Sequence, residues 1–114
     1  PARRWAFVAV RMFGLAVLVP VMEELFWRSF LLRYFTASRW RAVEHGAYSW
    51  PAFWVVAGAF SVAHPEWLAA AICAAAYALL LRRTKSVFAC VVAHAVTNLG
   101  LGIYVLVTGD VAFW

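Results

Sequence analysis

Long apolar runs separated by short polar stretches dominate the chain. The four runs cover residues 5–22, 50–64, 67–81 and 87–107, and the first can continue through "EELFWRSFLLRYF" to Phe35 as one helix. A membrane-spanning helix needs about 20 mostly apolar residues, so the second and third runs are short and need neighbouring helices or polar flanks to complete them. No stretch alternates with the period of two that predicts a strand. The pattern predicts an all-α, polytopic transmembrane bundle with about four membrane helices.

Polar stretches between the runs predict where the helices end. Residues 36–48, "TASRWRAVEHGAY", form a predicted loop, and residues 82–86, "RRTKS", form a predicted basic turn. Pro65 disfavours a helical conformation of His64, so the second helix should end near that residue. The length allows one domain, and the chain begins at Pro1 without an initiator Met. We therefore expect residues 1–114 to be a single transmembrane domain, the C-terminal part of a longer membrane protein whose upstream helices are partners of this one.

The composition excludes an ordinary soluble domain. Of the 114 residues, 67% are hydrophobic and only 13% are charged, whereas a soluble domain averages about 45–50% apolar and about 25% charged residues. The net charge is +5, but the basic residues cluster at the ends of apolar runs and not on one polar face. That placement predicts contact with membrane lipid and no nucleic-acid partner. Cys73 and Cys90 lie inside apolar runs, where cysteine acts as a small hydrophobic residue.

The distribution of basic residues predicts an orientation. If each run crosses the membrane once, one side receives two basic clusters, which are Arg33, Arg39 and Arg41 in the loop and Arg82, Arg83 and Lys85 in the turn. The opposite side receives Arg3, Arg4, Glu66 and Asp110. Because short cytoplasmic loops carry an excess of Lys and Arg, the side with the two clusters is predicted to be cytoplasmic.

Three groups of polar residues interrupt the apolar runs. They are Glu23, Glu24 and Arg28, then His64 four residues after Phe60, then His94 and Asn98. Burying a charge costs several kcal/mol unless it is paired, hydrated or used. Glu24 and Arg28 are four residues apart and can pair along one helix face. Glu23 lies about 100° around the helix, so we expect it to have no partner in its own helix.

The same topology places four of these residues at similar depths in the membrane. At about 1.5 Å per residue from the basic side, Glu23, His94, Asn98 and His64 lie between about 12 and about 21 Å deep, near the middle of a bilayer about 30 Å thick. A carboxylate and a histidine can hold and deprotonate a water. A second histidine and an asparagine can donate hydrogen bonds to an oxyanion. The set predicts hydrolysis of an amide by activated water.

At these residues the chain resembles the CAAX protease and bacteriocin-processing family (CPBP, also called ABI), whose members are intramembrane glutamic endopeptidases. The resemblance rests on three motifs, which are Glu23-Glu24-x-x-x-Arg28, Phe60-x-x-x-His64 and His94-x-x-x-Asn98. It covers roughly Pro20 to Leu99, and the context "VPVMEELFWRSFLLR" is similar to the bacterial CAAX prenyl protease-related subgroup. One such motif is weak evidence, whereas three in order within helices are specific. Family members usually carry further helices upstream.

The resemblance assigns a role to each motif residue. These roles are water activation by Glu23 and His64, an oxyanion hole of His94 and Asn98, a supporting pair of Glu24 and Arg28, and packing beside the site by Phe60. The resemblance also implies that no covalent nucleophile, cofactor or tightly bound metal takes part. It implies a membrane-associated peptide or protein substrate, prenylated or CAAX-like in the related enzymes, and a location in a bacterial inner membrane.

Three other functions are compatible with these residues. A zinc protease could use Glu23, His64 and His94 as ligands with an open fourth position, although the chain has no HExxH motif. A thiol protease could use Cys90, which shares a helix face with His94 and Asn98. A non-catalytic membrane scaffold or immunity-type protein could keep the same polar residues for binding or helix association.

Overall fold

The longest element of the protein is one continuous helix at its N-terminal end. The computed structural model describes residues 1–113, in which helices joined by short loops make up the fold and no strand occurs. The first helix runs from Ala2 to Thr36 and consists of α1 (Ala2–Phe13), α2 (Val19–Glu24) and α3 (Leu32–Thr36). At about 1.5 Å per residue, its 35 residues account for the full 52 Å length of the molecule. The expected continuation of the first apolar run to Phe35 is confirmed.

Two π-helical segments, Gly14–Leu18 and Leu25–Leu31, separate these three parts of the first helix. The first segment ends two residues before Pro20, whose ring crowds the carbonyl four residues earlier and which has no N–H to donate. In a π-helical turn each N–H bonds to the carbonyl five residues earlier instead of four, and this wider turn relieves the crowding. Such π segments are frequent at functional sites, and both lie within a few residues of Glu23 and Glu24.

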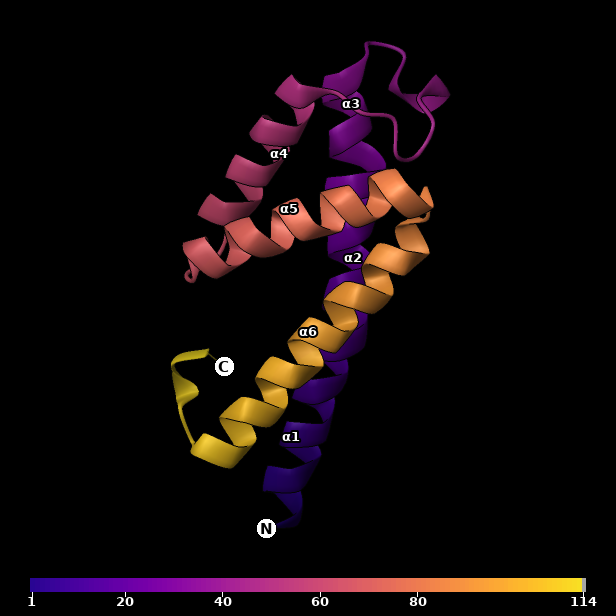
Figure 1. The fold of residues 1–114 in the computed structure, drawn as a ribbon. Coiled ribbons are helices and arrows are strands. Elements are labelled where there is room, and N and C mark those ends of the chain that lie inside the picture. The colour runs from indigo at the N-terminus through magenta and orange to yellow at the C-terminus, as the bar shows by residue number, and fades with distance from the viewer. Residues whose placement is uncertain (114) are drawn as a thin grey trace.

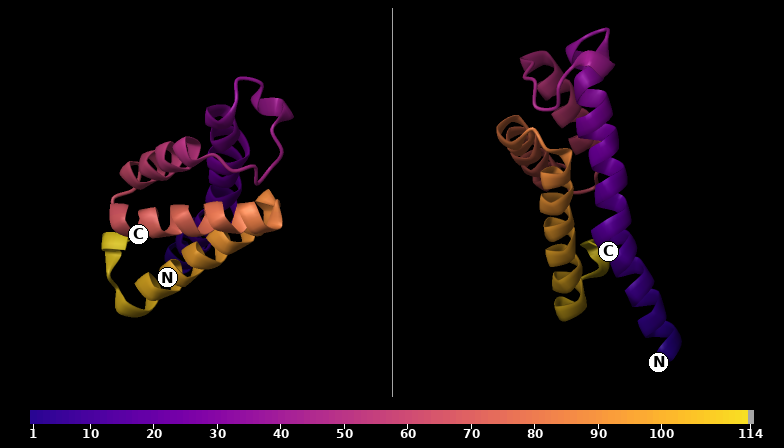
Figure 2. Two further views of the ribbon diagram at one scale, coloured as in Figure 1. Left: turned by 45° about the horizontal axis from the view of Figure 1, so that its top comes forward. Right: turned by 90° about the vertical axis from the view of Figure 1, so that its right-hand side faces the viewer.

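The remaining helices fold back along the first one. They are α4 (Trp50–Val62), α5 (Trp67–Thr84) and α6 (Val87–Thr108), with single 3₁₀ turns at Trp40–Ala42 and Val111–Phe113. α4 packs on α3, α5 packs on both α4 and α6, and α6 packs on α2 and the first π segment. α5 crosses the first helix steeply and α6 then descends beside its lower half (Figure 1), as the side view in Figure 2 also shows. The predicted all-α bundle of about four helices is confirmed.

Serine caps and a proline begin two of these helices at the predicted positions. The Ser49 hydroxyl accepts a hydrogen bond from the Ala52 N–H at the start of α4, and Ser86 does the same for Ala89 at the start of α6. These caps satisfy backbone donors that have no partner within the helix. Pro51 stands in the first turn of α4, where its missing N–H costs nothing. α4 ends at Val62, so His64 lies in the turn after it, as Pro65 predicts.

The loop after the first helix packs against the basic turn between α5 and α6. Gly46 has a φ of +85°, and a Cβ there would lie 2.7 Å from the Leu81 carbonyl oxygen, so only glycine fits. His45 lies 2.9 Å from the Ser29 hydroxyl. Partial burial, and then the nearby Arg33 charge, lower the pKa of His45. The loop and the turn, with the two basic clusters, therefore lie at the same end of the bundle.

Most of the large apolar side chains face outward and not into a core. Leu32, Ala52, Val56, Leu81 and Cys90 form the larger buried cluster, whereas residues such as Val62 and Val107 are 85% and 80% exposed. The first helix, α5 and α6 are long and apolar enough to cross a membrane, and α4 is shorter, at 13 residues. Exposed apolar surface around hydrogen-bonded helices is the arrangement that lipid requires. The chain is an integral membrane protein.

Candidate active site

Glu24 and Arg28 form a buried ion pair on the first helix. Arg28 Nη1 donates to Glu24 Oε1 over 3.1 Å, and the two side chains are 2% and 0% exposed. The Arg28 guanidinium also lies over the rings of Phe60 and Tyr77, at 4.5 Å and 5.2 Å from their centres. The pairing expected from the four-residue spacing therefore forms, and Phe60 packs on it from α4.

Glu24 has a second partner that its own helix does not contain. His94, on α6, donates from Nδ1 to Glu24 Oε1 over 2.7 Å. A carboxylate paired with arginine is ionised and can only accept, so the Nδ1 of His94 carries the hydrogen. The other ring nitrogen, Nε2, is left to face Glu23. The sequence predicted only Arg28 as a partner of Glu24, because a contact between residues 70 apart depends on how α6 packs.

Glu23 lies between the two histidines of the site. Its Oε2 atom is 3.6 Å from His64 Nε2 and 3.8 Å from His94 Nε2. Both distances exceed that of a direct hydrogen bond. Glu23 Oε2 is buried and has no hydrogen-bond partner within residues 1–113. Glu23, which lacks a partner in its own helix as expected, thus meets His64 and His94 in space.

His64 is held in the turn after α4 by the helix that it follows. Its Nδ1 donates to the Phe60 carbonyl oxygen over 2.7 Å. Because a carbonyl oxygen can only accept, Nδ1 carries the hydrogen and a neutral His64 turns an Nε2 lone pair toward Glu23. Phe60 therefore contributes its backbone as well as its ring, whose centre lies 4.3 Å from that of His64. The side chains of Glu23 and His64 are 27% and 30% exposed, so the site opens on this side.

Asn98 lies one turn of α6 beyond His94 and contacts the first helix. Its Nδ2 donates to the backbone carbonyl oxygen of Leu15 over 2.9 Å. The amide nitrogen carries two hydrogens, and this bond uses one of them. Residues four apart on a helix share a face, so Asn98 and His94 lie on the same side of α6. The contact with Leu15 was not expected from the sequence.

Tyr77 is a neighbour of the site that sequence reasoning missed. Its ring stacks on that of His94, with centres 5.2 Å apart, and its hydroxyl donates to Thr97 Oγ1 over 2.8 Å. The only available signal was a hydroxyl-bearing side chain in the otherwise apolar run "AAAYALLL". The fully buried Cys90 turns its thiol to the Tyr77 carbonyl oxygen, 3.4 Å away. That direction does not favour a thiol nucleophile acting with His94.

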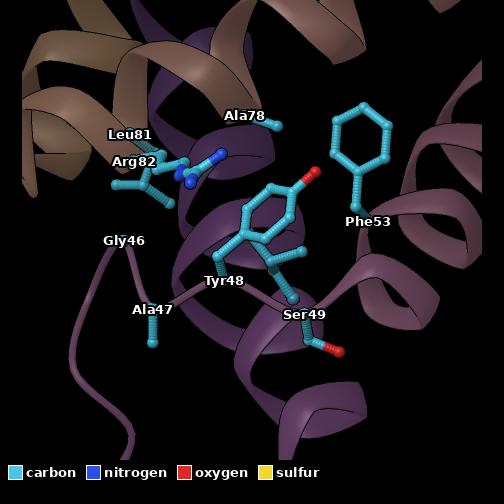
Figure 3. Close-up of a pocket in the computed structure, with 9 residues that line it drawn as sticks. Gly46, Ala47, Tyr48, Ser49, Phe53, Ala78, Leu81 and Arg82 are labelled. Carbon is cyan, nitrogen blue, oxygen red and sulfur yellow. The ribbon is translucent and has the colours of Figure 1, made fainter.

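Two further features bear on the kind of site. Within residues 1–113, no group of three or more His, Cys, Asp and Glu side chains was found that could hold a metal ion. A small hollow lies between the loop, α4 and α5, with Gly46, Tyr48, Phe53 and Arg82 among its lining residues (Figure 3). None of the seven motif residues lines that hollow, so the polar cluster around Glu23 is the candidate active site.

Comparison with known protein families identifies the chain. Residues 5–100 match the family described as type II CAAX prenyl endopeptidase Rce1-like. The matched range contains all seven motif residues and most of the chain. Comparisons with curated proteins and with solved structures found no match. The resemblance inferred from the three motifs is thereby confirmed, and the chain belongs to the Rce1-like family of type II CAAX prenyl endopeptidases, which are membrane-embedded proteases.

Proposed function

We propose that the chain hydrolyses a peptide bond of a membrane-associated substrate with a water activated by Glu23 and His64. The observation that carries this proposal is the convergence of Glu23 Oε2 on the Nε2 atoms of both histidines, at 3.6 Å and 3.8 Å. With Nδ1 protonated in His64, the His64 Nε2 lone pair and the Glu23 carboxylate are two acceptors that face the same point. A water there would have both of its hydrogens accepted and its oxygen lone pairs free to attack a carbonyl carbon.

The proposed reaction needs no covalent enzyme intermediate. As the water oxygen bonds to the substrate carbonyl carbon, one water proton passes to the Glu23 carboxylate while His64 Nε2 holds the other hydrogen. The carbonyl π bond breaks and its electrons form the oxyanion. When the C–N bond breaks, Glu23 returns its proton to the departing amine, so the carboxylate is regenerated. The position of Glu23 supports this role as proton acceptor and donor, because its carboxylate is close to both imidazoles and hydrogen-bonds directly to neither.

His94 and Asn98 are proposed to stabilise the oxyanion. The bond from His94 Nδ1 to Glu24 fixes the ring, so that Nε2, when protonated, donates into the space beside Glu23. Asn98 donates its second N–H from the next turn of α6. Oxyanion donors of this kind are each worth about 10² to 10³ in kcat. Glu24, paired with Arg28, holds the His94 ring by a hydrogen bond. Phe60 contacts both His64 and Arg28.

The substrate class and the location are part of the proposal. The family description supports a substrate with a CAAX-like, prenylated C-terminus, and the exposed apolar surface supports delivery of that substrate through lipid. The basic end of the bundle, with the loop and the turn, is proposed to face the cytoplasm of a bacterial cell by the positive-inside rule.

The experiment compares cleavage by the protein reconstituted in lipid with that by Glu23→Gln. A prenylated CAAX peptide with a fluorophore and a quencher on either side of the scissile bond reports hydrolysis. We expect Glu23→Gln to lower kcat by at least about 10², because glutamine accepts no proton. Glu66→Gln, in the turn before α5, is the matched control and should keep wild-type activity. Full activity of Glu23→Gln would disprove the mechanism, and peptide binding without cleavage by the wild type would favour the scaffold.

A further inference from the structure

The backbone carbonyl of Leu15 has no donor within its own helix. In an α-helix it would accept from the N–H of residue 19 and in a π-helix from that of residue 20. The Val19 N–H donates to Gly14 instead, and residue 20 is proline, which has no N–H. Pro20 is itself buried in the bundle. A carbonyl left without a partner in apolar surroundings is unfavourable, so Leu15 presents an acceptor to whatever packs against it.

Asn98 is the side chain that occupies this acceptor. Its Nδ2 lies 2.9 Å from the Leu15 oxygen, and a carbonyl oxygen can bond only to the NH₂ end of an amide. The Leu15 carbonyl therefore decides which way the Asn98 amide is turned. With one N–H held on the first helix, the plane of the amide is set and the second N–H has a defined direction.

The neighbouring turns of α6 hold this contact in register. One turn before Asn98, His94 bonds to Glu24. One turn after it, Gly102 lies against the side chain of Met12, where an added Cβ would be 2.6 Å from the sulfur. Three successive turns of α6 thus meet the first helix at a hydrogen bond, a second hydrogen bond and a close packing contact.

We propose that Pro20 is a positioning residue of the active site, which acts by keeping the Leu15 carbonyl free to hold the Asn98 amide in its working orientation. The inference rests on the proposed donation from Asn98 to the oxyanion. It adds that the backbone of the first helix sets the orientation of the Asn98 amide, because Pro20 has no N–H to donate to the Leu15 carbonyl. Pro20 touches neither substrate nor water in this scheme.

The first test observes the amide and needs no activity. Asn98 is the only side-chain amide in the chain, since the sequence contains one Asn and no Gln. Labelling with ¹⁵N-asparagine therefore gives a single NH₂ group in NMR spectra of the protein in lipid nanodiscs. In the wild type we expect one of its two protons to be shifted downfield and to exchange slowly. Pro20→Ala supplies an N–H to the first helix, and the two protons should then become similar in shift and exchange rate.

The second test measures kcat and KM separately. Pro20→Ala should lower kcat by about tenfold to a hundredfold and leave KM within twofold, because the substrate still binds but its oxyanion is poorly held. In the Asn98→Ala background the same change should have no further effect on kcat. Pro51→Ala is the matched control, since the N–H that it restores lies in the first turn of α4, and it should leave the amide signal and kcat unchanged.

The outcomes separate this inference from the proposed function. An Asn98 signal that is the same in wild type and Pro20→Ala overturns the inference whatever the activity. A changed signal with an unchanged kcat also overturns it, because Asn98 then moves without consequence. A changed signal with a lower kcat and no added effect on Asn98→Ala supports it. If the wild type cleaves no substrate, the proposed function fails and the positioning role fails with it, even where the NMR test confirms the Leu15–Asn98 contact.

Discussion

Glu23 and Glu24 are adjacent in the chain but lie in opposite environments. Glu24 is fully buried, and its Oε1 accepts from both Arg28 and His94. Glu23 is partly exposed and makes no direct hydrogen bond through its Oε2. The division follows from the 100° turn between successive helical residues, which points only Glu24 at the interior. This difference in environment supports the proposal that Glu24 is structural and that Glu23 takes part in the chemistry.

The replacement Glu24→Gln tests this division at the level of stability. It removes the carboxylate but leaves the Arg28 charge buried, and breaking a buried ion pair in this way costs about 3–5 kcal/mol. We expect the free energy of unfolding in detergent to fall by that amount, with a loss of activity because His94 is no longer held. Glu23→Gln is the control one residue away and should unfold like the wild type. Equal stability of the two variants would contradict the assignment.

At the scale of elements, the contact between α6 and the first helix assembles the site. α6 carries His94 and Asn98, and both bond to groups on the first helix, at Glu24 and at the Leu15 carbonyl. The helices approach closely at Gly102, where small residues commonly stand in membrane helix interfaces. Apolar periodicity predicts that such helices exist, but the rotation and depth at which they meet depend on individual side chains. That is why the Asn98–Leu15 contact could not be predicted.

Gly102→Leu should separate these two helices. The new side chain would occupy the space of Met12 and Leu15, and overpacking of this kind costs about 1–3 kcal/mol. We expect lower stability and at least a tenfold loss of kcat, because His94 and Asn98 move away from their partners. Gly100→Leu is the matched control, since a Cβ there meets nothing within 4 Å. Comparable losses in both variants would show that the defect comes from leucine in α6 and not from the interface.

The whole molecule is asymmetric along its length. The molecule is 52 Å long, and the loop after the first helix packs against the basic turn near one end of it (Figure 1). α4 and α5 shield only the upper part of the first helix, and α6 covers the lower part. Such a shape leaves a large apolar surface in contact with lipid, and it places the Glu23 cluster at the level where α4, α6 and the first helix meet.

Cysteine labelling tests the proposed orientation of the whole molecule. Ser38 lies exposed in the loop and Thr108 lies exposed at the end of α6, so each can be replaced by cysteine as Ser38→Cys or Thr108→Cys. With a membrane-impermeant thiol reagent on intact cells, we expect Thr108→Cys to react and Ser38→Cys to react only in inverted vesicles. The unsubstituted chain, whose Cys73 and Cys90 lie within helices, gives the background. If Ser38→Cys reacted in intact cells, the loop would lie outside the cell and the proposed orientation would be wrong.

The sequence alone determined the helical elements and predicted the members of the candidate site. Apolar length set the helices to within a few residues, Pro65 ended α4 before His64, and four-residue spacing paired Glu24 with Arg28, because all of these depend on neighbours along one stretch of chain. It also placed Glu23, His64, His94 and Asn98 near the middle of the membrane, because depth can be counted from the helix ends at about 1.5 Å per residue.

Only the tertiary structure decided which atoms face one another. The bond of Glu24 to His94, the stacking of Tyr77 on His94 and the use of the Leu15 carbonyl by Asn98 all join residues on different helices. Each depends on the rotation of one helix against another, which side-chain packing sets and periodicity does not. The π-helical segments likewise depend on how the chain around Pro20 accommodates a missing N–H while buried against α6.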